Sequence, residues 1–207
     1  MISSLDVALK IRQRLNKVDT QDDENLPLYV IVEAYNKGQL NIVNRLSSKN
    51  NIYKTGLEST TFRVDDLECL INPDAYILST TKKDGFYLTD YIPKDYLRYI
   101  RTTCIAKTSS CKGKELYIYL QEESNLNTLL NNDFVNPSFE WAETIGTIAG
   151  DKIKVFTQNK FEINKVYLTY LRKPRLIDLA GYIKKDGSPS TNIDPELPDD
   201  LVEMSID

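Results

Sequence analysis

The chain has 207 residues, of which 41% are hydrophobic and 27% are charged, and its 26 basic and 30 acidic side chains give a net charge of −4. A chain of this length can bury roughly 70% of its unfolded surface, so it can fold around one large core or two modest ones without disulfides. The net negative charge argues against a dedicated DNA-binding protein. No stretch approaches the ~20 apolar residues of a membrane-spanning helix, and the N-terminus lacks a signal-peptide pattern, so we expect no membrane segment and an intracellular site of assembly.

The sequence contains no histidine, and it has three cysteines, Cys69, Cys104 and Cys111. Without histidine, Ser-His and Cys-His nucleophile pairs, most zinc sites and the commonest general base are excluded. The cysteines lack the paired spacing of metal ligands, and we expect them to be reduced and packed in or near the core. The eight glycines are too widely spaced for a phosphate-binding loop. We therefore predict no catalytic residue, no cofactor and no metal ion.

Apolar residues at helical spacing predict two helices near the start of the chain. The first covers residues 4–17, where the apolar positions are Leu5, Ala8, Ile11 and Leu15. After a polar loop at 19–25, a second helix of about five turns is expected from Pro27 across Gly38 to residue 46. Its apolar stripe predicts core packing in a helical hairpin or, alternatively, a contact with another subunit. Gly38 indicates close packing against another element or a kink.

Residues 61–172 favour β-structure. A short extended piece at 61–64 precedes Asp65 and Glu68, whose spacing suits the capping box of a short helix. Alternating apolar and polar residues then predict strands, which a helix over 124–130 interrupts. The strands are expected at 86–88, 97–106, 115–120, 138–148, 152–157 and 163–172. Short strands at close intervals predict an antiparallel sheet or sandwich.

The last part of the chain is acidic. From Leu176 onward there are eight acidic residues and only two basic ones, Lys184 and Lys185, which gives a net charge of −6 and leaves +2 for residues 1–175. Its prolines and polar residues cannot build a core, so we expect an extended arm that lies across a neighbour and begins a short helix near its end.

The predicted fold class is therefore α+β, in three regions. Residues 1–60 form an N-terminal helical hairpin or bundle. Residues 61–175 form a mainly β region with short helices, arranged as an antiparallel sheet or sandwich. Residues 176–207 form the extended acidic C-terminal arm.

Two alternatives to a purely structural role follow from the composition. The adjacent carboxylates Glu122–Glu123 and Asp199–Asp200 could serve a carboxylate-based hydrolase. Each pair, however, precedes a helical segment whose N-terminus attracts negative charge. Tyrosines on predicted strands, together with arginines, could form protein contacts or stack on single-stranded nucleic acid. Tyrosine also simply suits half-buried strands.

Three stretches of the sequence carry a resemblance to a known family. They are LYVIVEAYN and LNIVNR within the helix 28–45, NDFVNPSFEW at 132–141, and LTYLRKP at 168–174 followed by the acidic tail. With the Asn- and Lys-rich composition, they resemble the structural ring proteins of the head-to-tail connector in crAss-like bacteriophages. More distantly, the chain is similar to the tail adaptor proteins of short-tailed phages.

The resemblance implies a virion protein, assembled in the host cytoplasm, that forms a ring of about twelve copies in the connector or tail. Such a ring would stack on the portal protein or on neighbouring tail or ring proteins, around the channel through which the genome is ejected, and would lie close to genomic DNA without reading its sequence. The helices would contact ring neighbours, and the acidic arm would reach a neighbouring chain, with the positively charged body as its electrostatic partner. The candidate subunit-contact residues are Tyr35, Arg45, Arg172, Tyr182, Leu197 and Leu201.

Overall fold

The computed structural model describes residues 2–18, 26–47, 67–111, 113–132 and 134–206. The chain divides into two compact units, which we call the helical unit (Met1–Leu70 and Lys173–Asp207) and the barrel unit (Ile71–Arg172). The acidic tail therefore belongs to the same unit as the N-terminal helices. The expected region boundary between residues 60 and 61, the extended piece at 61–64 and the loop at 19–25 lie outside the described residues.

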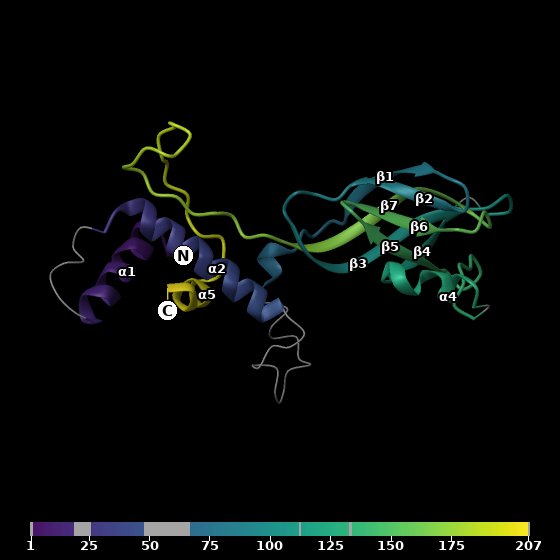
Figure 1. Ribbon diagram of the computed structural model, residues 1–207, viewed down its shortest axis with the longest axis horizontal. Coiled ribbons are helices and arrows are strands. Elements are labelled where there is room, and N and C mark those ends of the chain that lie inside the picture. Colours follow the sequence, from purple (N-terminus) through teal and green to yellow (C-terminus); the bar gives the residue numbers. More distant parts are fainter. Residues whose placement is uncertain (1, 19–25, 48–66, 112, 133, 207) are drawn as a thin grey trace, which may run out of the picture. The chain divides into compact units, whose positions relative to one another are not determined.

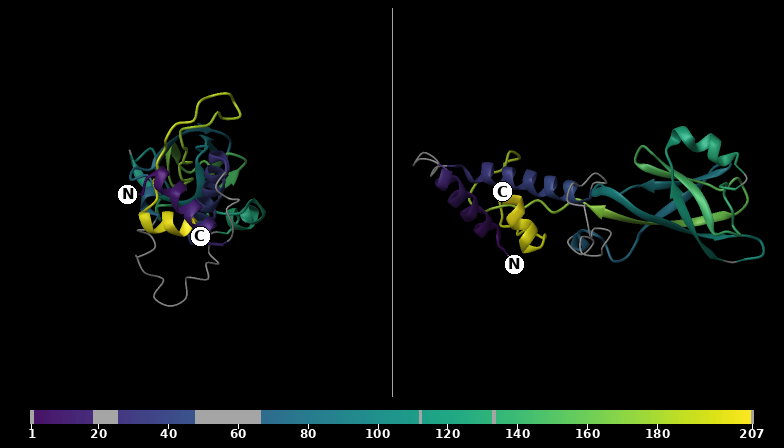
Figure 2. Two further views of the ribbon diagram at one scale, coloured as in Figure 1. Left: turned by 90° about the vertical axis from the view of Figure 1, so that its left-hand side faces the viewer. Right: turned by 90° about the horizontal axis from the view of Figure 1, so that it is seen from below.

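The described residues of the helical unit form three α-helices, α1 (Ser4–Val18), α2 (Leu28–Ser47) and α5 (Asp199–Ile206), and a 3₁₀ turn, η3 (Glu68–Leu70). Both helices expected from the apolar spacing are present, and the predicted stripe of α2 is buried. On α1 the predicted face is only partly correct, because Leu5 is exposed and Val7 is buried together with the predicted Ala8. Helix α5 lies against α2 and close to α1 (Figures 1 and 2). The C-terminal segment adds five buried aliphatic side chains to this unit, namely Ile177, Leu179, Leu197, Leu201 and Val202.

Gly38 is the point of closest approach between α2 and α5. A Cβ atom at this position would collide with the backbone carbonyl oxygen of Ser205. The prediction that Gly38 marks close packing is confirmed, because only a residue without a side chain admits the α5 backbone here.

The carboxylates of the tail contact the N-terminal segment of their own chain. Asp199 and Asp194 accept hydrogen bonds from the amides of Ile2 and Ser4, each at 2.8 Å. On the α5 helix, Glu203 forms ion pairs with Lys10 and, at 3.1 Å, with Arg14. The tail is thus folded onto α1 and α2, and the prediction of an extended arm is wrong. These contacts of its carboxylates lie within the same chain.

Seven strands form the barrel unit, in the order β1-β2-β6-β5-β4-β3-β7, and β7 pairs back onto β1 to close it (Figure 1). All neighbours are antiparallel except β4 and β5, which run parallel. The strands are β1 (Tyr76–Lys82), β2 (Phe86–Tyr91), β3 (Tyr96–Lys107), β4 (Lys114–Leu120), β5 (Glu143–Ala149), β6 (Lys152–Phe156) and β7 (Glu162–Arg172). The 3₁₀ helix η4 (Glu123–Asn125) and the helix α4 (Leu126–Leu130) lie between β4 and β5 in the sequence.

Apolar side chains fill the inside of the barrel, so it is a packed core and not a pore. Alternation along the strands produces this core, as in β6, where Ile153 and Val155 are buried and their neighbours are half-buried. Its buried members are Leu78, Tyr87, Cys104, Ala106, Leu116, Ile118, Ile153, Val155, Phe161, Ile163, Val166, Leu168 and Tyr170.

The predicted fold class, a helical hairpin with an antiparallel sheet or sandwich and an extended arm, is wrong. The sheet is a closed, mixed barrel, because the long connection 121–142 returns β5 parallel to β4 and because β1 pairs with β7. Closure removes the exposed strand edges that an open sheet would leave. The strand β1 was not expected from the sequence, since Leu78 is its one buried residue and its alternation is weak.

Candidate functional site

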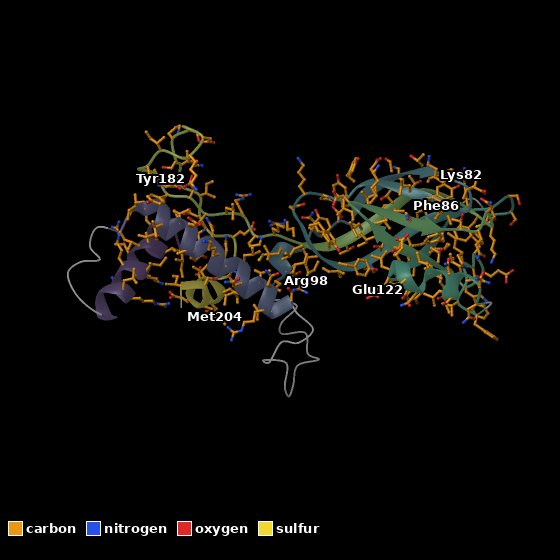
Figure 3. The ribbon with its side chains drawn as sticks, viewed as in Figure 1. Lys82, Phe86, Arg98, Glu122, Tyr182 and Met204 are labelled. Carbon is orange, nitrogen blue, oxygen red and sulfur yellow. The ribbon has the colours of Figure 1, made fainter. Side chains whose placement is uncertain are left out.

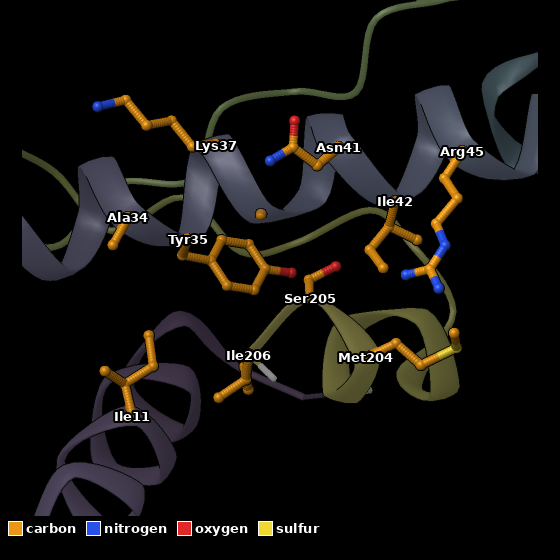
Figure 4. Close-up of a pocket in the computed structure, with 11 residues that line it drawn as sticks. Ile11, Ala34, Tyr35, Lys37, Asn41, Ile42, Arg45, Met204, Ser205 and Ile206 are labelled. Atoms are coloured by element: carbon orange, nitrogen blue, oxygen red, sulfur yellow. The ribbon is translucent and has the colours of Figure 1, made fainter.

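The first candidate site is a groove of about 710 Å³ between α2 and α5, close to α1 (Figure 4). Tyr35 crosses its floor, and its side chain is only 1% exposed. Burial raises the pKa of Tyr35 to about 12, and the nearby Ser205 offsets part of that rise. Arg45 and Met204 lie at one end of the groove. Because Tyr35 is buried between the two helices, we interpret this groove mainly as the contact surface between α2 and α5.

A second groove, of about 740 Å³, lies along the other side of α2, and we call it the apolar groove. One wall comes from α2 and the other from the segment 176–185, which loops away from the helices (Figure 1). Its apolar lining residues are Tyr29, Val32, Leu40, Leu176, Tyr182 and Ile183, and its charged ones are Glu33, Lys37, Lys184 and Lys185. Ile183 is 76% exposed, and Tyr29, Leu40 and Leu176 are also exposed. An apolar surface of this kind is typical of a protein contact.

The buried carboxylate of Asp178 fixes the outer wall of the apolar groove. It accepts a hydrogen bond from the Tyr182 hydroxyl at 2.6 Å and an ion pair from Lys184 at 2.7 Å. The amides of Leu179 and Thr191 also donate to it, at 2.9 and 3.3 Å. Burial by itself would raise the pKa of Asp178, but these donors outweigh burial and lower the pKa from 3.8 to about 2. The carboxylate in turn raises the pKa of Tyr182 to about 12. The wall is therefore ordered without a regular helix or strand.

This arrangement predicts an acid-sensitive helical unit. Because the pKa of Asp178 is lower in the folded chain than its ordinary value of 3.8, its stabilising effect is complete above that value and is lost as the pH falls toward 2. Asp178→Asn should lower the stability of the helical unit by about 1–3 kcal/mol near neutral pH and should flatten its dependence on acid. Urea unfolding of the helical signal at a series of pH values measures both effects. An unchanged acid profile in the variant would contradict the role of Asp178.

The third candidate site is a cluster of exposed apolar side chains on the barrel unit, Phe134, Val135 and Trp141, which we call the aromatic knob. Phe134 is 98% exposed and Trp141 is 78% exposed. The knob surrounds a hollow of about 390 Å³ that Glu143 also lines. Between Trp141 and Glu143, Ala142 has a φ of 59°, a conformation that costs a residue with a side chain about 1 kcal/mol or more. The strained turn displays the aromatic rings toward solvent.

Two tyrosines of β4 extend the apolar surface beside the knob. Tyr117 is the register partner of Glu143, and the Tyr117 amide donates to the carbonyl of Ala142 at 2.8 Å. The rings of Tyr117 and Tyr119 pack with their centroids 4.7 Å apart, and both side chains are exposed. Exposed aromatic residues in one region are enriched in protein interfaces.

The charges of the barrel unit are unevenly distributed along the sequence. Residues 115–143, which contain the knob and both tyrosines, have six acidic residues and no basic one, whereas the rest of the unit has thirteen basic and six acidic residues. One of the six, Glu122, directly precedes η4, which leads into α4 (Figure 3). Three lysines of other segments reach this region: Lys114 donates to the carbonyls of Phe139 and Glu140, Lys160 donates to the Asn136 side chain and to the carbonyl of Pro137, and Lys154 pairs with Glu123. The segment that carries the knob is therefore acidic in sequence, with lysines of other segments bound to its backbone and to one of its carboxylates.

The structure places the six residues predicted from the sequence in different environments. Tyr35, Leu197 and Leu201 are buried in the helical unit, where they form its core. Arg45 is exposed near the end of α2, and Arg172 is the last residue of β7. Tyr182 lines the apolar groove (Figure 3). The structure brings Tyr35 and Arg45 together in the first groove, and their role in subunit contacts stays a prediction.

Sequence reasoning missed the aromatic knob and most of the apolar groove. The knob could have been recognised from Phe134 and Trp141, two large apolar residues in a turn-rich segment around Pro137. The groove could have been recognised from Leu176 and Ile183, two apolar residues within a polar, acidic tail.

Within the described ranges, no group of three or more Cys, Asp or Glu side chains is placed to hold a metal ion. The same ranges contain no helix with both the length and the apolar character that crossing a membrane requires. Cys104 is buried, which raises the pKa of its thiol to about 12, while Cys69 is exposed and Cys111 is intermediate.

Known proteins were compared with the chain at the level of families and of individual sequences. No protein-family model matches the chain, and no curated protein matches its sequence. The two exposed apolar surfaces are therefore the basis of the functional interpretation.

Proposed function

We propose that this chain is a structural subunit that assembles with copies of itself into a ring. The observation that carries the proposal is the presence of two different exposed apolar surfaces, the aromatic knob and the apolar groove, on two different units of one chain. A subunit with two unlike adhesive surfaces forms heterologous contacts, and such contacts produce a closed ring when the rotation between neighbours closes.

The narrower proposal is a ring in the head-to-tail connector of a bacteriophage, stacked on the portal protein or a neighbouring ring around the DNA channel. Its support is the resemblance carried by residues 28–45, 132–141 and 168–174. The first of these stretches supplies one wall of the apolar groove, and the second contains the aromatic knob. Two of the three stretches therefore contain residues of the exposed apolar surfaces, and residues 168–174 line neither surface.

The acidic surroundings of the exposed tyrosines weigh against the nucleic-acid alternative. Single-stranded nucleic acid binds where aromatic side chains lie in a positively charged groove. Tyr117, Tyr119 and Trp141 instead lie in the segment 115–143, which has no basic residue. The carboxylates of this segment disfavour a phosphate backbone at these three side chains, so a protein contact suits them better than a nucleic acid does.

Self-assembly is tested by sedimentation velocity and native mass spectrometry of the purified protein over a range of concentrations. We expect oligomers whose fraction rises with concentration, and negative-stain electron microscopy should show closed rings with a central hole. A contact with a dissociation constant of about 1 mM is worth only about 4 kcal/mol. A chain that stays monomeric up to that concentration would therefore contradict the proposal, and filaments without rings would contradict the closed geometry.

A further inference from the structure

We propose that the aromatic knob of one copy inserts into the apolar groove of the next copy. The inference rests on the proposed function and names the two surfaces that meet in it. The knob projects Phe134 and Trp141, which are 98% and 78% exposed, and the apolar groove has a volume of about 740 Å³. Two aromatic side chains of this kind each bury about 150–250 Å² when they are enclosed, so they form a suitable anchor for an interface.

The charges around the two surfaces are complementary. Exposed Glu140 and Glu143 flank or line the knob, and neither forms an ion pair within the described residues. The groove is lined by Lys37, Lys184 and Lys185 against a single carboxylate, Glu33. Glu33 pairs with Lys37 at 2.9 Å and the buried Asp178 pairs with Lys184, so Lys185 supplies the excess positive charge. Opposite charges at the rim of an apolar contact set its register and its partner.

Both surfaces are held in place before any contact forms. Hydrogen bonds between Asp178 and the backbone fix the groove wall, and the Ala142 turn, whose carbonyl accepts from Tyr117, fixes the base of the knob. Preformed surfaces lose less conformational entropy on binding than mobile ones. The contact is heterologous, because the knob and the groove are different patches, and it leaves one free knob and one free groove on every open chain of copies.

Trp141 is the one tryptophan of the sequence, so its fluorescence reports directly on the knob. As the protein concentration rises and oligomers form, we expect the emission to move to shorter wavelength and quenching by acrylamide to decrease. Ile183→Asp, in the groove, should suppress both changes although Trp141 is intact. Ile77→Asp is the matched control, because Ile77 is an exposed isoleucine on β1, outside the knob and the groove. Circular dichroism confirms that each variant is folded.

A charge exchange provides the second test. The knob variant Glu140→Lys/Glu143→Lys and the groove variant Lys37→Glu/Lys185→Glu should each assemble about a hundredfold more weakly than the original chain, because like charges then face each other. Lys184 is left unchanged since it pairs with the buried Asp178. Mixing the two variants should restore assembly, with the two species in equal numbers in every ring. Native mass spectrometry measures that ratio.

The outcomes separate this inference from the proposed function. Oligomers that form without any change in Trp141 fluorescence, or charge variants that assemble normally, would overturn the knob-in-groove contact and leave self-assembly standing. An equal loss of assembly in the Ile77→Asp control would also overturn the contact, because it would show that the effect of Ile183→Asp does not depend on its position in the groove. A concentration-independent burial of Trp141 would show that the knob docks within its own chain. A monomer at every concentration would overturn both proposals.

Discussion

Removal of residues 176–207 is expected to unfold the helical unit and to leave the barrel folded. The deleted segment supplies Ile177, Leu179, Leu197, Leu201 and Val202, all buried against α1 and α2. Burial of one such side chain stabilises a protein by about 1.5–3 kcal/mol, so five of them account for as much as the whole stability of a typical domain. Sequence composition alone suggests an extended arm that lies across a neighbouring chain, whereas the structure makes the segment part of the core of the helical unit.

Limited proteolysis with mass spectrometry measures this outcome. The truncated chain should be cut within α1 and α2, while the segment Ile71–Arg172 stays protected, and the helical signal in circular dichroism should fall. In the full-length protein, two leucine-to-alanine substitutions in the same segment, one at a buried and one at an exposed position, serve as a matched pair. Leu201→Ala, at a buried position, should cost about 2–5 kcal/mol, and Leu176→Ala, at an exposed position, less than about 0.5 kcal/mol. Protected helices in the truncated chain would contradict the expectation.

Gly38→Val is expected to separate α5 from α2. The new side chain would collide with the carbonyl oxygen of Ser205, which is backbone and cannot turn away. Overpacking of this kind costs about 1–3 kcal/mol, and it exceeds the gain of a few tenths of a kcal/mol in helix propensity that valine offers over glycine. Hydrogen exchange of the α5 amides should rise, because the helix would open more often.

Asn41→Ala is the matched control for this substitution. Asn41 is exposed on the same helix, and alanine there should leave α5 protected and slightly raise the stability of α2. If α5 stays equally protected in Gly38→Val, the interpretation of Gly38 as the contact point of the two helices is contradicted.

Local patterns predicted the helices and most strands correctly because their apolar faces are regular. The stripe through Ile31, Tyr35 and Ile42 and the alternation in β7 each depend on one element only. Closure of the barrel depends on which strands pair, as in Ile77 with Tyr167, and on the parallel return of β5. Pairing between distant strands leaves no local signal, so the sequence favoured a simple antiparallel sheet.

The candidate surfaces were harder to anticipate for a related reason. Periodicity identifies apolar residues that are buried, whereas Phe134, Trp141 and Ile183 lie in irregular segments and face solvent. Composition identified the acidic tail, but it could not show that Asp194 and Glu203 find their partners on α1 of the same chain. The net charge is a property of the whole segment, whereas the partner of each carboxylate depends on how the chain folds.

The barrel is an insertion between the two halves of the helical unit, and this connectivity sets an order of folding during synthesis. Strands β1 to β7 follow one another without interruption by any other unit, so the barrel can close once Arg172 has left the ribosome. Helix α2 is made earlier, and its apolar face stays uncovered until residues 177–202 have emerged. The wall of the apolar groove formed by residues 176–185 also follows β7 in the sequence, so this groove takes shape only after the last strand of the barrel has been made.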